Sequence, residues 1–140
     1  MKISYYREEH VYFRIVGLAS DLLTTLQQRL DGVHVEHRQR NGKSDFVLSV
    51  ELSTPAVCDI VRRAVSSLSL KEPYGLYVSL VTERDSDGVR LEPFICKFWK
   101  AVGGNLDFSF TVVDLERKAK RKKVRLRKSK KSGLRSNKKK

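Results

Sequence analysis

The most conspicuous chemistry in this sequence is a run of positive charge at its C-terminal end. Residues 117–140, the basic segment, contain 15 Lys and Arg and no Asp or Glu, whereas residues 1–116 contain 14 basic and 16 acidic residues. The net charge of +13 therefore divides into −2 and +15. Clustered Lys and Arg displace counterions from a polyanion, and Arg can hold a phosphate through two hydrogen bonds. The residues expected to bind nucleic acid are Arg117, Lys118, Lys120, Arg121, Lys122, Lys123, Arg125, Arg127, Lys128, Lys130, Lys131 and Arg135.

The composition of the basic segment predicts binding with little sequence specificity. It contains no aromatic residue, so its side chains cannot stack on bases, and neither RNA nor DNA is favoured. Apolar residues are sparse over 115–140, which predicts a helical or disordered tail. Other interpretations are a nuclear-import signal at 118–123 in a eukaryotic source, an acidic protein partner, an anionic lipid surface, or no role. No apolar helical face or lipidation site supports the lipid surface.

A second set of candidate residues lies on the predicted outer face of a sheet. Over residues 10–17, apolar and polar side chains alternate, which predicts a half-buried strand. The face opposite the apolar one would carry a partner surface formed by Tyr12, Arg14, His34 and Tyr77. Such residues could stack on RNA as in RRM domains, but the strand over 45–53 lacks the exposed aromatic residues of that family. A solvated face or a protein contact, including a homodimer, explains the composition better.

The residue spacing does not support metal binding or catalysis. His34 and His37 are three apart on a predicted strand, so they point to opposite faces. Cys58 and Cys96 lie in apolar helical patterns, which predicts two free, buried thiols in a reducing compartment. The sequence has neither a nucleophile elbow nor a phosphate-binding loop. We therefore expect a protein that is not an enzyme and that holds no cofactor or metal.

Periodicity predicts the elements that position these residues. The first strand is followed by a helix over 20–30, with Ser20 as its N-cap and leucines every four residues. Alternating strands over 33–39 and 45–53 flank Asn41–Gly42, a strong hairpin signal.

The second half of the folded region repeats the pattern of helix and strand. Thr54–Pro55 predicts a helix start, Pro73 and Gly75 predict a stop, and a strand follows. A short helix and a last strand over 105–113, with alternating apolar side chains, come after it. The order predicts an α+β fold: a ferredoxin-like split βαββαβ antiparallel sheet with an added helix and strand. The predicted domains are 1–114 for this fold and 115–140 for the basic tail.

Three segments carry a resemblance to a protein family. "HVYFRIVG", "YVSLVTERDSDGVRLEP" and "KAVGGNLDFSFTVV", spread over residues 10–113, look like an uncharacterised bacterial family of small single-domain α+β proteins. Some of its members occur beside polymorphic-toxin systems, so the resemblance implies a possible immunity role. The chain departs from the family by lacking its Gly-x-x-Pro segment after the first helix and by carrying the basic segment. No functional residue can be transferred from it.

These observations lead to two functional hypotheses. The first is a binding protein that attaches to RNA or DNA through the basic segment, with the α+β domain acting as a dimer or partner module. The second is an immunity-like or inhibitor protein that binds a protein partner through its sheet face or edge. The chain has no apolar run of about 18 residues and its first ten residues contain no apolar stretch, so we expect no membrane partner and a cytoplasmic location, or a nuclear one in a eukaryote.

Overall fold

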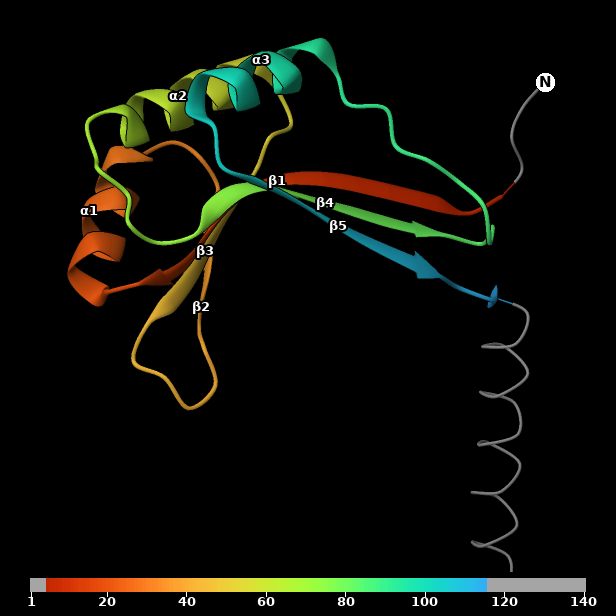
Figure 1. Ribbon diagram of the computed structural model, residues 1–140, viewed down its shortest axis with the longest axis horizontal. Coiled ribbons are helices and arrows are strands. Elements are labelled where there is room, and N and C mark those ends of the chain that lie inside the picture. Colours follow the sequence, from red (N-terminus) through yellow and green to blue (C-terminus); the bar gives the residue numbers. More distant parts are fainter. Residues whose placement is uncertain (1–4, 116–140) are drawn as a thin grey trace, which may run out of the picture.

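Three helices cover one face of a five-stranded sheet in this α+β domain (Figure 1). The computed structural model describes residues 5–115, so the basic segment and the predictions made for it lie outside the described residues. No helix in the described range is long and apolar enough to cross a membrane. In chain order the elements are β1 (Arg7–Leu18), α1 (Ser20–Arg29), β2 (Glu36–Gln39), β3 (Phe46–Glu51), α2 (Pro55–Ser66), β4 (Tyr74–Thr82), α3 (Pro93–Val102) and β5 (Asn105–Val112).

The sheet is mixed, with strand order β2-β3-β1-β4-β5. The pairs β2–β3, β3–β1 and β1–β4 are antiparallel. Only β4 and β5 run parallel, and α3 supplies the crossover connection that a parallel pair requires. The two edges of the sheet are therefore β2, the shortest described strand, and β5, the last one.

The hydrophobic core lies between the helices and one face of the sheet. Phe13 and Ile15 on β1 are 1% and 0% exposed, and they pack with Leu48 of β3 and Leu76 of β4. The ring of Phe98, on α3, meets Phe13 edge-on with ring centroids 5.6 Å apart. The period-two pattern thus correctly predicted which face of β1, β3 and β4 is buried.

Local signals fix several element boundaries. The hydroxyl of Thr54 accepts a hydrogen bond from the N–H of Val57 at 3.2 Å, and Pro55 is the first residue of α2, as predicted. At α1 the prediction of the cap was wrong, because the helix already includes Ser20 and Ala19 is the N-cap. The strand predicted over 33–39 begins only at Glu36.

Two glycines allow β5 to start directly beside β4. The prediction that Gly75 ends an element was wrong, since it is the second residue of β4. A Cβ atom on Gly75 would lie 2.0 Å from the carbonyl oxygen of Asn105, and one on Gly104 would lie 2.4 Å from the carbonyl oxygen of Tyr74. The absence of side chains at both positions is therefore a condition for the β4–β5 pair.

Candidate interaction surfaces

The outer face of the sheet, opposite the helices, carries a cluster of two tyrosines and an arginine. Tyr12 and Tyr77 are register partners on β1 and β4, and their ring centroids are 6.3 Å apart. The guanidinium carbon of Arg14 lies 4.2 Å from the centre of the Tyr77 ring, within cation–π range. All three side chains are partly buried. The structure therefore brings together three of the four residues predicted for a partner surface.

A histidine bridged by two carboxylates extends this cluster along β1. The Nδ1 atom of His10 lies 2.7 Å from Glu51, and its Nε2 atom lies 2.8 Å from Glu8. These hydrogen bonds, the one with Glu51 first and that with Glu8 second, raise the pKa of His10 above its ordinary value of 6.5. The His10 ring also stacks on Tyr12 with centroids 6.0 Å apart. Acidic and basic groups therefore alternate on this face, so it presents no uniformly positive surface to a phosphate backbone.

His34, the fourth predicted residue, has a different location. It lies in the loop before β2, its side chain is 85% exposed, and its Nε2 atom is 3.6 Å from Glu36. The cause is the shortness of β2, which leaves residues 31–35 outside the sheet.

A surface that sequence reasoning missed runs along β5. Its apolar side chains share the helix-side face of the sheet with their register partners on β4, yet they are exposed. The exposed fractions are 46% for Leu106, 54% for Phe108, 37% for Phe110 and 49% for Val112, and we call these four residues the β5 stripe. In Figure 1, β4 and β5 run out beyond α1, α2 and α3, so the C-terminal part of β5 lies away from the three described helices. Alternation had identified these residues as one face, but it does not tell whether another element packs on that face.

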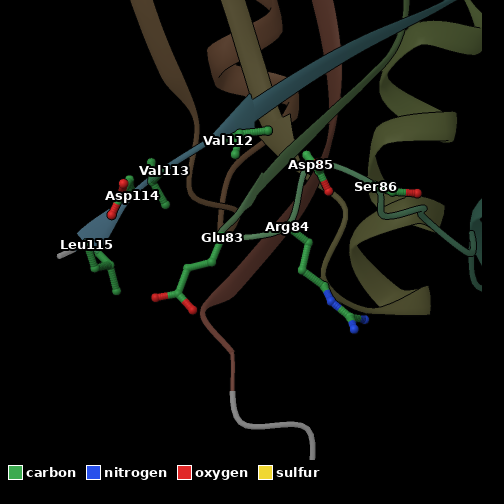
Figure 2. A pocket seen from close by; sticks show the side chains of 8 residues that line it. All are labelled: Glu83, Arg84, Asp85, Ser86, Val112, Val113, Asp114 and Leu115. Carbon is green, nitrogen blue, oxygen red and sulfur yellow. The ribbon is translucent and has the colours of Figure 1, made fainter. Parts of the chain in front are cut away.

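An open hollow lies at the end of β5, where the described chain stops. It has a volume of about 880 Å³, and Figure 2 shows Val112 to Leu115 on one side of it and Glu83 to Ser86 on the other. Its lining contains the carboxylates of Glu83, Asp85 and Asp114 and one positive charge, that of Arg84. Within residues 5–115 no group of three His, Cys, Asp or Glu side chains could hold a metal ion. The hollow is wide and solvent-exposed, unlike the enclosed pockets that bind small molecules.

The two cysteines differ in their surroundings. Cys58 on α2 is buried, and desolvation raises the pKa of its thiol to about 11, which keeps it protonated and unreactive. Cys96 on α3 is exposed, so the prediction of two buried thiols was wrong for one of them. The helix α3 presents Cys96 to solvent because Ile95 and Phe98 take its buried face.

Searches of family models, curated proteins and solved structures found no match to this chain. The features of the molecule that bear on its function are therefore the surfaces of the domain and the charge of the basic segment.

Proposed function

We propose that this protein is a non-enzymatic binding protein that attaches to nucleic acid through the basic segment, with the α+β domain acting as a dimer or partner module. The observation that carries the proposal is the separation of charge: +15 in residues 117–140 against −2 in residues 1–116. A polyanion is the partner that such a segment attracts most strongly, because every phosphate contact releases a counterion.

The surfaces of the domain support this division of roles. The outer face mixes basic with acidic side chains, and the hollow at the end of β5 is lined by three carboxylates and one guanidinium group, that of Arg84. Neither surface would attract phosphate. The affinity for nucleic acid is therefore assigned to the basic segment.

The salt dependence of binding tests the proposal. If about six to ten basic side chains meet phosphates, affinity for duplex DNA falls roughly 10³- to 10⁵-fold between 50 and 200 mM salt. We expect fluorescence anisotropy with two unrelated oligonucleotides to give similar affinities for both. Replacing Lys120, Lys122 and Lys123 by Gln should lower the slope of log affinity against log salt by about 0.9 for each lost contact.

A matched control separates the basic segment from general surface charge. Lys43, Lys71 and Lys97 are exposed residues of the domain, so the triple change Lys43→Gln, Lys71→Gln and Lys97→Gln removes the same number of positive charges from the domain instead. We expect it to leave the slope unchanged. Binding that weakens equally in both variants, or that survives deletion of residues 117–140, would contradict the proposal.

We further infer that the first four strands and two helices form a ferredoxin-like unit to which α3 and β5 are appended. The element order βαββαβ and the antiparallel strand order β2-β3-β1-β4 support this assignment. The unit would present its helix-free face, with Tyr12 and Tyr77, to solvent or to a partner.

The outer-face cluster favours a second candidate function, that of an immunity-like or inhibitor protein. Tyrosine and arginine are enriched where proteins bind one another, and here two tyrosines and Arg14 are held in contact by the sheet. A defined protein partner that binds the wild type but not the Tyr12→Ala, Tyr77→Ala variant would support this function. Equal binding to both would remove this face from consideration.

A further inference from the structure

The edge strand β5 combines two features that proteins usually avoid in an exposed strand. Among residues 5–115 it pairs with β4 on one side only, so within this range the backbone N–H and C=O groups that point to its other side have no strand partner. The strand also carries the β5 stripe, in which Phe108 and Phe110 lie nearly parallel with centroids 6.4 Å apart. Over its eight residues, NLDFSFTV, it contains one charge, no Lys and no Pro. Such an edge is a template for another strand.

We propose that the free edge of β5 pairs with the same edge of a second copy of this chain, in an antiparallel two-fold arrangement centred on Ser109. The proposal deepens the dimer role included in the proposed function, but it does not depend on nucleic-acid binding. A second copy supplies a strand of the same length and the same alternation.

The sequence of β5 is complementary to itself in this register. With Ser109 facing its own counterpart, Phe108 lies opposite Phe110 and Leu106 lies opposite Val112 of the second copy. The four apolar residues of each strand then continue one another on the helix-side face, where aromatic and branched side chains favour cross-strand pairing. The two Asp107 carboxylates face Thr111 rather than each other, so the register avoids like-charge repulsion.

The two-fold relation between the copies determines the antiparallel direction. When the same edge of two identical sheets pairs around a two-fold axis perpendicular to the sheet, the two strands run in opposite directions and each residue pair occurs twice. One strand can therefore supply both sides of the contact.

Sedimentation equilibrium of the full chain without nucleic acid tests whether two copies pair through the free edge of β5. We expect a monomer–dimer equilibrium and a dissociation constant at least tenfold weaker for Phe108→Lys, which puts a charge into the apolar row. Phe108 is 54% exposed, so this change should leave the domain folded, which circular dichroism would verify. The matched control is Gln39→Lys on the exposed edge strand β2, with an unchanged dissociation constant. A wild type that stays monomeric at several hundred micromolar, or a dimer that persists in Phe108→Lys, would overturn the proposal.

Disulfide trapping tests the register. In a Cys96→Ser background treated with oxidised glutathione, Ser109→Cys should form a covalent dimer rapidly, because facing side chains on antiparallel strands have Cβ atoms roughly 4.5–5.5 Å apart. Asp107→Cys alone should cross-link slowly, and Asp107→Cys combined with Thr111→Cys should cross-link rapidly. The opposite pattern would exclude the register centred on Ser109. Neither experiment involves nucleic acid, so a failure here and a failure of the proposed function can be told apart.

Discussion

The two edge strands of the sheet, β2 and β5, differ in how well they are protected against pairing with another chain. At one edge, β2 is four residues long, and its sequence EHRQ places exposed charged or polar side chains on both faces. At the other edge, β5 is eight residues long and alternates polar residues with the exposed β5 stripe. Short length and charge are devices that keep an edge strand from pairing with another chain. The molecule protects β2 and leaves β5 open.

This difference determines the kind of assembly that the domain can form. If both edges could pair, successive copies would add without limit and produce a filament. With one open edge that is complementary to itself, assembly closes at two copies. In such a dimer the two β5 strands point in opposite directions, so their C-terminal ends lie at opposite ends of the joint edge.

The largest effect is expected where β5 joins the sheet. In Gly75→Ala the new methyl group would meet the backbone of Asn105, so we expect a loss of about 2 to 4 kcal/mol in the free energy of unfolding and a loss of dimerisation. Gly88→Ala is the matched control, because no atom lies within 4 Å of its Cβ position. Urea unfolding measures both. Equal stability of the two variants would show that the β4–β5 contact is not as tight as described.

A smaller effect is expected on the outer face. Tyr77→Ala removes the contacts of this ring with Tyr12 and Arg14, and we expect a loss of about 1 to 2 kcal/mol in unfolding free energy. The dimer constant should not change, since this face lies away from the β5 stripe. Tyr77→Phe keeps the ring and should retain most of the stability. A weaker dimer in Tyr77→Ala would indicate that the dimer interface lies on the outer face of the sheet and not at the edge of β5.

Removing the charges of β2 should allow this edge strand, like β5, to pair with another copy of the chain. We expect Glu36→Thr with Arg38→Thr to form species larger than a dimer at high concentration, because every dimer has two β2 edges. Sedimentation velocity over a concentration series would detect them. If the variant still stops at the dimer, then the shortness of β2 protects this edge and its charges do not.

The smallest effect concerns His10. Because its folded-state pKa is raised, the protonated ring stabilises the fold fully below pH 6.5, and this contribution is lost as the pH rises through the raised value. The side chain is 33% exposed, so we expect no more than about 1 kcal/mol, measured as the difference in unfolding free energy between wild type and His10→Gln over pH 5 to 9. A difference that is constant over this range would mean that Glu8 and Glu51 do not hold the proton.

The sequence predicted much of the fold because its signals are local. Alternation identified the buried face of β1, Asn41–Gly42 marked the β2–β3 hairpin, and Thr54–Pro55 marked the start of α2. The predictions failed where distant segments decide the outcome. Gly75 was interpreted as the end of an element. The structure gives another reason for glycine at this position, because a Cβ atom there would collide with the backbone of Asn105, which is distant in the sequence.

The candidate surfaces were predicted less completely for the same reason. Tyr12, Arg14 and Tyr77 were found because strand alternation and pairing order place them together. The exposure of the β5 stripe was missed, since alternation groups side chains by face but carries no information on where the helix layer ends. A last strand that follows a crossover helix and carries few charges was the available sign of an open edge.

Amide hydrogen exchange at different protein concentrations tests the contrast between the edges most directly. Above the dissociation constant, we predict that the outward-pointing amides of β5 exchange at least tenfold more slowly than at high dilution, while those of β2 do not change. Phe108→Lys should abolish this concentration dependence. Amides of β5 that exchange rapidly at every concentration, or that stay protected even at high dilution, would contradict pairing with a second copy.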